Sequence, residues 1–262
     1  MILDTVIGGR AVAVDLSHPI DCALPLDFEA EQPQVFGLAA ATRTPVRAGT
    51  FVGDTRRGGS CNCETITLNP HGNGTHTEGY GHISEARLSV MSTPPPPLLD
   101  AWVLSITPEP LATSGESYGG QSSPTDNVLT AAALRRGLQN VEQVGALIVR
   151  TAAHDPERRR RNYDANPAPY PTADAMRFLR ERGVQHLLLD TPSADRQEDG
   201  GRLTNHRIFW ADGDHGGRTI TELIDVPDIV DDGPHLLNLQ MPPLHLDAVP
   251  SRRLLFAPTL RN

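Results

Sequence analysis

The clearest pattern of apolar and polar positions lies in the second half of the chain. Two short apolar runs, at residues 146–150 and 184–190, flank a segment at 172–182 whose apolar residues recur at helical spacing. Gly183 directly follows that segment and is a typical helix stop. Two apolar strands joined by an amphipathic helix form a βαβ unit, in which the strands are parallel and the crossover is right-handed. The pattern therefore predicts parallel strands within an α/β fold.

Shorter patterns predict further elements around this unit. Alternating apolar and β-branched residues predict three more strands, at residues 11–14, 63–68 and 101–106. A short helix is predicted near residues 130–138, with Thr130 or Asp126 as its N-cap. Two segments rich in Pro, Gly, Ser, Thr or Ala are predicted to be loops. The segment at residues 22–59 is expected to form a flap over a site, and the segment at residues 108–127 a surface excursion.

The length of the chain limits the number of domains. With 262 residues it can bury a sizeable core, and it lies within the range that one α/β domain fills. The sequence contains neither an internal repeat nor a low-complexity tail. We therefore predict one α/β domain over residues 1–262, with a mixed sheet that includes the βαβ unit.

Charge and composition narrow the class of partner. A formal charge of -9 and an isoelectric point near 5.5 argue against a nucleic acid or an anionic membrane, because phosphate binding needs a basic field. No stretch approaches the roughly 20 apolar residues that span a bilayer, and the N-terminus has no signal-peptide pattern. The three cysteines are too few for a disulfide framework. These features predict a cytoplasmic protein that acts on a small molecule.

Arginine supplies every basic side chain, since lysine is absent. That absence excludes Schiff-base and other catalytic-lysine mechanisms. The only dense basic run, residues 158–161, is interpreted as a solvated loop. A functional use of this run would be the capture of a substrate carboxylate.

One segment concentrates the candidate chemistry. Residues 71–82 hold three histidines, one glutamate and four glycines, in the order His-Gly-Asn-Gly-Thr-His-Thr-Glu-Gly-Tyr-Gly-His. In an extended chain, His76 and Glu78 project from the same face, which suits two ligands of one metal. The glycines allow tight turns that bring His71 and His82 to the same point.

The chemistry follows from this ligand set. Imidazole nitrogen and carboxylate oxygen suit Zn²⁺ or Mn²⁺, and the absence of a cysteine cluster argues against an iron–sulfur centre. A divalent ion with an open position lowers the pKa of a bound water towards about 7. Hydrolysis of an activated carbonyl is the simplest use of such a site.

The order of motifs resembles that of a known family. Residues 71–82 are similar to the His-x-Gly-Thr-His-x-Asp-x-Pro-x-His signature of the cyclase and kynurenine formamidase family. Four more motifs occur in the family's order, namely Asp-Leu-Ser-His-Pro at 15–19, Asp-Thr-Pro-Ser-Ala-Asp at 190–195, Asn-His-Arg-Ile-Phe at 205–209 and Glu-Leu-Ile-Asp at 222–225. Five motifs in register are far more specific than any one of them.

The resemblance implies a compact swivelling β/β/α fold, a homodimer or homotetramer, and one or two divalent ions, commonly zinc or manganese. It implies that His76 is a ligand of the first metal and that Glu78 bridges two metals. His82 resembles the family's proton-transfer histidine. His206 and Glu222 resemble the ligands that complete a second metal position.

Three departures from the family pattern affect the ligand set. One extra residue separates His71 from His76, so either a bulge restores His71 as a ligand or the site has lost one. Glu78 replaces the family's aspartate and is one methylene longer. The segment between His206 and Glu222 is also longer and contains His215, which is an alternative partner of Glu222.

Two further residues are predicted to support the site. Asp190 and Ser193 follow the strand at 184–190, and we expect them to order the loop beneath the metal through hydrogen bonds. A nucleophilic triad of Ser193, Asp195 and His206 is the alternative, but no Gly-x-Ser-x-Gly elbow precedes a helix here.

By resemblance, the leading function is the metal-dependent hydrolysis of a carbon–nitrogen amide bond other than a peptide bond. The substrate would be an arylformamide such as N-formylkynurenine, or a cyclic amide. The competing hypothesis is a non-catalytic protein on the same fold that binds a metal or a small ligand. A site in which Glu78 and His71 point away from each other would favour the binding protein.

Overall fold

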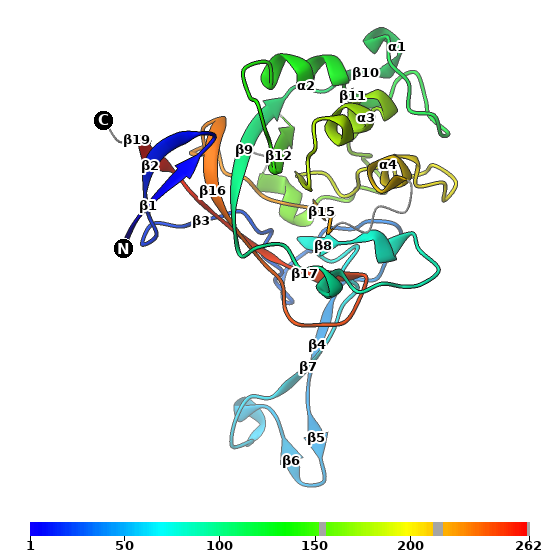
Figure 1. Cartoon of the computed structure of the whole chain (residues 1–262). Helices are drawn as coiled ribbons and strands as arrows, with labels where there is room; N and C mark the ends of the chain where they lie inside the picture. The colour runs from blue at the N-terminus through cyan, green and yellow to red at the C-terminus, as the bar shows by residue number, and fades with distance from the viewer. Residues whose placement is uncertain (152–155, 212–216, 261–262) are drawn as a thin grey trace.

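A nine-stranded mixed sheet forms the centre of the computed structural model, within the described residues 1–151, 156–211 and 217–260 (Figure 1). The strands of this sheet, in order across it, are β17 (Ala248–Pro250), β8 (His76–Glu78), β15 (Thr219–Glu222), β14 (His186–Leu189), β12 (Ala146–Thr151), β9 (Leu98–Ile106), β16 (Gly233–Gln240), β18 (Arg252–Phe256) and β3 (Ile20–Asp21). Since strands from near both ends of the chain share this sheet, it ties most of the sequence into one α/β domain, as predicted.

The centre of the sheet is parallel and its two sides are antiparallel. β15, β14, β12 and β9 pair in parallel, whereas β8, β17, β16, β18 and β3 pair antiparallel with their neighbours. β12 and β14 are the two predicted strands of the βαβ unit, with Ala146 paired to His186. Between them lies α3 (Ala173–Glu181), which is N-capped by Thr172 and followed by Gly183 at φ 76°. The predicted βαβ unit is therefore confirmed.

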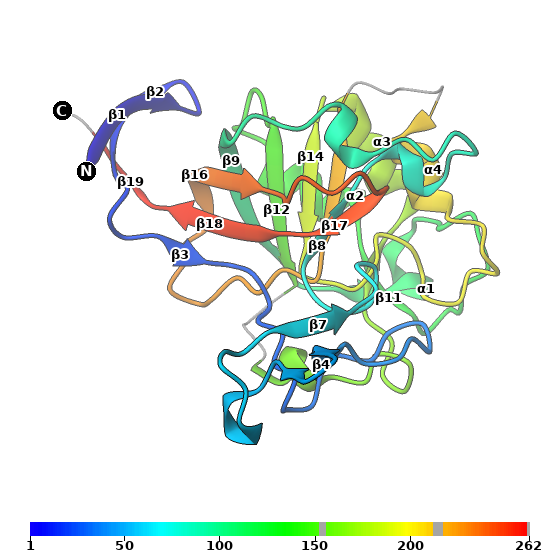
Figure 2. The ribbon, with the colours of Figure 1, turned by 90° about the horizontal axis from the view of Figure 1, so that it is seen from below.

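Both faces of the sheet are covered, which explains why the central parallel strands β12 and β14 are mostly apolar. Alternate residues of β12 point to opposite faces, so Leu147 and Val149 pack under the helices while Ala146 and Ile148 pack on the other side. The helical layer consists of α2 (Ala131–Gly137), α3 and α4 (Thr204–Phe209) (Figures 1 and 2). Within the described residues, no helix is long and apolar enough to cross a membrane.

Smaller elements complete the fold. β1 (Ile2–Ile7), β2 (Arg10–Asp15) and β19 (Pro258–Leu260) form one three-stranded sheet, and β10 (Glu109–Pro110), β11 (Asn127–Leu129) and β13 (Tyr170–Pro171) form another. Short helical turns lie at α1 (Leu111–Ser114), η1 (Thr55–Arg57), η2 (Tyr80–His82), η3 (Val90–Ser92) and η4 (Pro156–Arg160). The predicted helix near residues 130–138 is α2, and its N-cap is Thr130, whose hydroxyl accepts from the Ala133 amide.

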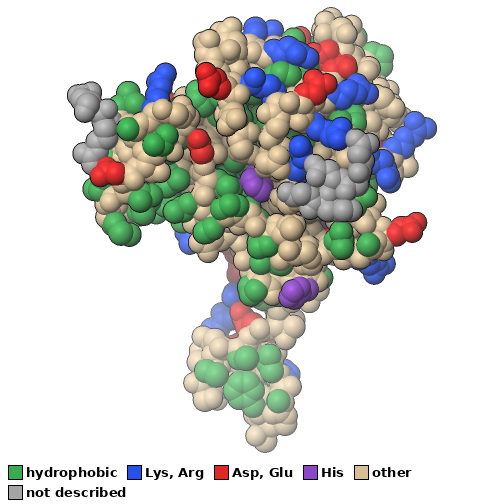
Figure 3. All heavy atoms as spheres, viewed as in Figure 1, with side chains coloured by type: hydrophobic (Ala, Val, Ile, Leu, Met, Phe, Trp, Pro, Cys, Tyr) green, Lys and Arg blue, Asp and Glu red, His purple; other side chains and the backbone are tan. Residues whose placement is uncertain are grey.

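The segment at residues 22–59, predicted to be loops, contains strands instead. β4 (Thr42–Pro45) pairs with β7 (Glu64–Thr67), and β5 (Arg47–Ala48) pairs with β6 (Phe51–Val52). These strands form an arm, residues 42–67, that projects from the body of the protein (Figures 1 and 3). The strand predicted at 63–68 is thus β7, and it lies in this exposed arm rather than in the main sheet. The loop prediction failed because β4 and β5 are short and mostly exposed, and so show no alternation of apolar and polar residues.

The predicted surface excursion at residues 108–127 is also partly wrong. It carries β10 and α1, and one of its side chains, Tyr118, is only 1% exposed. Tyr118 packs edge-on against Tyr170, with ring centroids 4.8 Å apart. The segment is therefore anchored to the interior in spite of its Ser- and Gly-rich composition.

The basic run at residues 158–161 differs from its interpretation as a solvated loop. Arg158 is buried, and its Nη1 lies 2.7 Å from the buried carboxylate of Asp190. Arg159 pairs with the buried carboxylate of Asp225 at 3.2 Å. Two arginines of the run therefore neutralise carboxylates at the carboxyl ends of the strands, where an unpaired buried charge would be costly.

Candidate metal centre

The candidate ligands converge on β8, which lies between β17 and β15 near one side of the main sheet. His76 and Glu78 project from the same face of this strand, and both are 0% exposed. Glu222 of β15 is paired directly opposite His76 in the strand register. Helix α4 then contributes His206, which is 1% exposed. The extended conformation expected for His76 and Glu78 is confirmed.

A turn before β8 takes up the extra residue of the first motif. The backbone amides of Gly72 and Asn73 both donate to the Asn69 carbonyl, at 3.2 and 3.0 Å. This turn compacts the segment between His71 and His76, and the two rings lie 5.3 Å apart between centroids. The additional residue therefore does not remove His71 from the site.

A second turn after β8 returns His82 towards Glu78. The turn η2 needs a glycine at position 81, because a Cβ at Gly81 would lie 1.8 Å from the Leu88 carbonyl oxygen. The His82 side chain is 22% exposed and its ring lies 4.3 Å from that of His71 between centroids. His82 is thus held beside the other histidines but at the more exposed side of the cluster.

The carboxylate of Glu78 is the centre of the cluster. Its Oε1 lies 2.7 Å from His206 Nε2, and its Oε2 lies 3.1 Å from His71 Nδ1. His82 Nε2 is more distant, at 3.8 Å from Oε2. Glu78 belongs to two groups of possible ligands, one with His71 and His76 and the other with His82 and His206. Within each group, the ligand atoms all lie within 4.8 Å of one another. This shared position is the geometry expected of a bridging carboxylate.

Glu222 forms the second carboxylate of the site. Its Oε2 lies 3.4 Å from His76 Nε2, and its Oε1 lies 3.6 Å from His206 Nε2. The Ala194 amide donates to Oε1 at 2.7 Å and fixes the carboxylate. Glu222 is therefore adjacent to His206, as the sequence analysis expected, whereas the alternative partner His215 lies outside the described residues.

In each histidine, the ring nitrogen that points away from the glutamates, here called the outer nitrogen, has a hydrogen-bond acceptor. Asp247 Oδ2 accepts from His71 Nε2 at 3.1 Å and from His82 Nδ1 at 3.4 Å. These bonds leave His71 Nδ1 and His82 Nε2 to face Glu78. Asp247 therefore sets which nitrogen of two neighbouring rings points inward.

The other two histidines follow the same rule. His206 Nδ1 lies 2.5 Å from Asp195 Oδ2, and His76 Nδ1 lies 3.0 Å from the Gly74 carbonyl. In both rings Nε2 is consequently the nitrogen that faces the glutamates. In all four rings, one nitrogen is held by a hydrogen bond and the other faces a glutamate. Metal-ligating histidines have this arrangement.

Charge pairing dominates the electrostatics of this buried cluster. Burial disfavours the charged form of Glu78, but His206 and His82 outweigh it and hold the pKa of Glu78 well below its usual range. Burial likewise disfavours the His206 imidazolium, but Glu78 and Asp195 raise the pKa of His206 well above its usual value. His71 follows the same pattern, because Asp247 and Glu78 overcome its burial and raise its pKa to about 10.

The donor set fits a divalent metal. Among the described residues, two buried atoms facing the centre of the cluster have no hydrogen-bond partner, His76 Nε2 and Glu78 Oε2. Both have close neighbours, at 3.4 Å in Glu222 and 3.1 Å in His71, but not in hydrogen-bonding geometry. Unsatisfied buried polar atoms are costly, and imidazole with carboxylate is a ligand set that suits zinc or manganese.

A pocket of about 330 Å³ opens onto the cluster. Its walls include the side chains of Phe36 and Leu203, and its floor includes His71, His82 and His206. Both Phe36 and Leu203 have positive φ, at 58° and 49°, an unusual conformation for such residues at a pocket wall. The pocket is within the size range of small-molecule sites.

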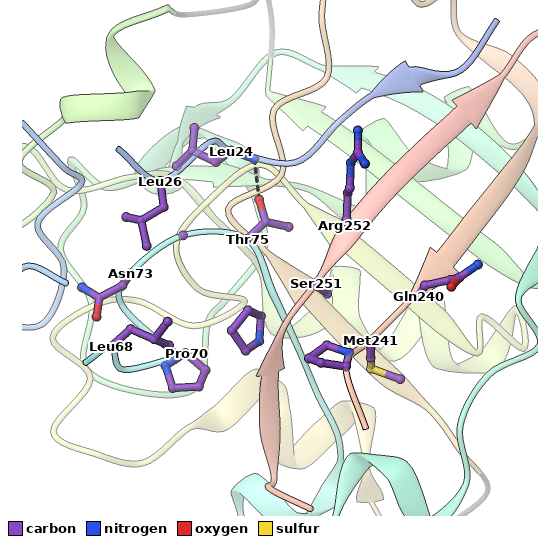
Figure 4. Close-up of a pocket in the computed structure, with 13 residues that line it drawn as sticks. Leu24, Leu26, Leu68, Pro70, Asn73, Thr75, Gln240, Met241, Ser251 and Arg252 are labelled. Atoms are coloured by element: carbon purple, nitrogen blue, oxygen red, sulfur yellow. Dashed lines mark hydrogen bonds between the residues drawn. The ribbon is translucent and has the colours of Figure 1, made fainter. Parts of the chain in front are cut away.

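A larger cavity of about 490 Å³ lies elsewhere and holds none of the candidate ligands (Figure 4). Leucines, prolines and Met241 line it, and Thr75 in its wall accepts a hydrogen bond from the Leu24 amide (Figure 4). Its one arginine, Arg252, pairs with Asp21 at 2.8 Å. We therefore assign the chemistry to the smaller pocket, because His71, His82 and His206 line it together with Glu222.

The two predicted supporting residues have different surroundings. Ser193 lines the pocket, and its Oγ accepts from the Asp195 amide at 3.0 Å. The Asp190 carboxylate instead bonds Thr151 and pairs with Arg158, away from the candidate ligands. The alternative triad does not form, because the inner nitrogen of His206 faces Glu78 rather than Ser193.

Two carboxylates that hold the outer histidine nitrogens, Asp247 and Asp195, were not predicted from the sequence in this role. Asp247 lies outside every recognised motif, and no local pattern marks it. Asp195 ends the Asp-Thr-Pro-Ser-Ala-Asp motif, so its position in that motif is the signal that could have found it.

A mixed α/β sheet that gathers four histidines and two buried glutamates beside a small-molecule pocket defines a metal-binding α/β protein. The chain belongs to the family described as Putative cyclase, which matches residues 14–196, more than half of the sequence. The resemblance found in the sequence is thereby confirmed. No curated protein matches the chain.

Solved structures share the fold at low sequence identity. Isatin hydrolase A from Labrenzia aggregata is similar, with a TM-score of 0.63 and 17% identity, over 92% of this chain and 93% of that one. A potential metal-dependent hydrolase with cyclase activity has a TM-score of 0.62 and 15% identity, over 91% and 97% of the chains. A predicted metal-dependent hydrolase from Bacillus stearothermophilus has a TM-score of 0.59 and 15% identity, over 91% and 98%.

Proposed function

We propose that this protein is a metal-dependent hydrolase of a carbon–nitrogen amide bond other than a peptide bond. The observation that carries the proposal is the convergence of four inward-facing imidazole nitrogens on Glu78 and Glu222 beside a pocket. Membership of the cyclase family and the likeness of the fold to isatin hydrolases support it. Isatin is a cyclic amide, so hydrolysis of such a bond is compatible with this fold.

The chain offers ligands for one or two ions of zinc or manganese. His71, His76 and Glu78 would hold one ion, since their ligand atoms lie within 4.8 Å of one another. His206 would hold a second ion with the two glutamates, as its Nε2 lies 2.7 Å from Glu78 and 3.6 Å from Glu222. A bound divalent ion supplies a nucleophilic water at neutral pH and polarises the carbonyl oxygen. Because a hydrogen bond to the outer nitrogen already orients each ring, the rings need little rearrangement to accept the ion.

His82 is suited to proton transfer on the substrate side. It is one of the more exposed histidines of the cluster, and it lines the pocket. The departing amine needs a proton, which the imidazolium of His82 can donate. Asp247 holds the outer nitrogen of that ring at 3.4 Å and keeps Nε2 directed inward.

The pocket favours a small aromatic or cyclic amide. Its volume of about 330 Å³ suits a molecule of one or two rings, and Phe36 offers a face for stacking. An arylformamide such as N-formylkynurenine, or a cyclic amide such as isatin, fits this description. The alternative of a non-catalytic binding protein is disfavoured, because Glu78 and His71 face each other at 3.1 Å.

Purified protein loaded with Mn²⁺ or Zn²⁺ is expected to hydrolyse an arylformamide or a cyclic amide but not an unactivated peptide. Loss of substrate absorbance measures turnover, with a peptide amide of similar size as the control. If none of the small amides is turned over although metal is bound, the binding protein becomes the better account.

We also propose that the protein is a homodimer or homotetramer in which the arm contacts a second copy. A two-stranded ribbon is only marginally stable alone, and this one exposes Ile66 by 56% and Leu68 at its base by 37%. The arm carries four arginines and two acidic residues, a net charge of +2, whereas the remaining 19 basic and 30 acidic residues give -11. This charge complementarity favours an acidic second copy as the partner.

Light scattering at micromolar concentration is expected to give at least twice the mass of one chain, 28.3 kDa. Ile66→Asp should weaken the assembly, whereas Ile229→Asp, at an exposed residue outside the arm, should leave it unchanged. A monomeric mass for the unaltered protein would refute the assembly, and equal effects of the two substitutions would remove the arm from it.

A further inference from the structure

Tyr118 is a buried phenol outside every motif of the sequence. It is 1% exposed and comes from the segment between α1 and β11, far along the chain from the histidines. Its hydroxyl donates towards Asp195 Oδ1 at 2.6 Å and also lies 3.1 Å from Asp199 Oδ2. The Arg196 amide in turn donates to the phenol oxygen at 3.2 Å. One hydroxyl therefore contacts three residues of a single loop.

The first of these contacts leads to the metal centre. Asp195 uses Oδ2 to hold His206 Nδ1 at 2.5 Å, and His206 Nε2 lies 2.7 Å from Glu78. The other oxygen, Oδ1, is fixed by the Tyr118 hydroxyl and by the Asn205 amide at 2.6 Å. Since a carboxylate rotates as a unit, the bonds on Oδ1 determine where Oδ2 points. The Tyr118 hydroxyl is thus two hydrogen bonds away from a candidate ligand.

The second contact leads to the wall of the pocket. Asp199 Oδ1 accepts from the Arg202 amide at 3.0 Å, and its Oδ2 accepts from the Leu203 amide at 2.7 Å. Leu203 lines the pocket at a positive φ of 49°, a conformation that such a residue adopts only when its surroundings enforce it. Tyr118 joins Asp199 to Asp195 and so closes the loop that forms this wall.

We propose that Tyr118 is a positioning residue whose hydroxyl fixes both the metal-facing nitrogen of His206 and the loop wall around Leu203. This inference rests on the proposed metal-dependent hydrolase and deepens it, because it couples the metal centre to the substrate pocket through one side chain. Burial and the Asp195 carboxylate raise the pKa of Tyr118, so the phenol keeps its proton and stays a donor.

A matched pair of substitutions tests the proposal. Tyr118→Phe removes only the hydroxyl and keeps the ring packed on Tyr170. Tyr170→Phe removes the second hydroxyl of the same aromatic pair, which bonds Asp126 at 2.7 Å and touches neither Asp195 nor Asp199. A general loss of stability would appear in both variants, whereas a positioning role appears only in the first.

Two readouts that need no turnover separate the outcomes. Calorimetric titration with Mn²⁺ should show affinity about 10-fold weaker for Tyr118→Phe than for wild type and Tyr170→Phe. This is the low end of the usual effect of losing a group that orients a ligand, because the phenol acts through Asp195. Hydrogen exchange followed by mass spectrometry should show faster exchange of the 202–205 segment in Tyr118→Phe alone, because its amides bond Asp195 and Asp199, the carboxylates that the phenol holds. A third readout, which does need turnover, is steady-state kinetics, in which Tyr118→Phe should show a raised KM together with a lowered kcat.

Each result decides the proposal. Equal Mn²⁺ affinity in the two variants would overturn the link to His206, and equal exchange in residues 202–205 would overturn the link to the pocket wall. Wild-type protein that binds no Mn²⁺ would refute the proposed function and the link to His206 together. Wild-type protein that binds Mn²⁺ but hydrolyses no amide would refute the proposed function alone, and affinity and exchange would still test Tyr118.

Discussion

Replacing Glu78 with glutamine is expected to abolish stoichiometric binding of Zn²⁺ or Mn²⁺. Glu78 is fully buried and lies within 3.8 Å of His71, His82 and His206. Glutamine keeps the shape of the side chain but removes the charge that a divalent ion requires at this shared position. Since outer-shell substitutions already cost about 10- to 100-fold, loss of this central ligand should weaken binding by more than about 100-fold. Elemental analysis and calorimetry measure the effect.

Glu64→Gln is the matched control for this substitution. Glu64 lies in the arm and pairs with Arg43, so its replacement should leave the metal content unchanged. Full metal occupancy in Glu78→Gln would show that the site is not centred on Glu78. Such a result would favour a set made of His71, His82 and Asp247, the other group of possible ligands in the described residues.

Replacing His82 with alanine is expected to lower kcat by about 10²- to 10⁴-fold, the usual contribution of a general acid or base. The metal content should stay near that of the wild type. The reason is geometric, because His82 Nε2 is 3.8 Å from Glu78, farther than the inner nitrogens of His71 and His206, and the side chain faces the pocket. Its loss should therefore affect proton transfer more than ion binding.

His245→Ala provides the control, since His245 is exposed and lies only two residues before Asp247. It should retain both metal and activity. If His82→Ala loses metal and activity together, His82 is a ligand and not a proton donor. The structure allows either result, because the ligand atoms of His82, Glu78 and His206 lie within 4.8 Å of one another.

Most parts of the fold and site that the sequence predicted have a local signal. The βαβ unit of β12, α3 and β14 follows from apolar periodicity, with Thr172 and Gly183 marking the helix ends. The cluster around Glu78 was predictable because three histidines and a glutamate lie within one short segment. His206 and Glu222 were found through their motifs, since nothing local distinguishes them from other buried polar residues.

The parts that were missed depend on contacts between distant segments. Asp247 reaches His71 and His82 only because β17 pairs with β8, and that pairing has no local pattern. Tyr118 lies in a Ser- and Gly-rich segment whose composition indicates a surface loop. Its side chain is nevertheless buried, and its hydroxyl donates a hydrogen bond to the buried Asp195 carboxylate. The part of the arm before residue 60 was predicted as loops because both faces of β4 and β5 are largely solvated and neither face needs an apolar pattern.

The most direct test of the central claim is a metal titration of hydrolysis. Protein stripped with a chelator and dialysed should be inactive on an arylformamide or a cyclic amide such as isatin. Turnover should return in proportion to added Zn²⁺ or Mn²⁺ and reach a plateau at one or two ions per chain. Activity that survives complete removal of the metal, or a metal-loaded protein that leaves every such amide intact, would contradict the account.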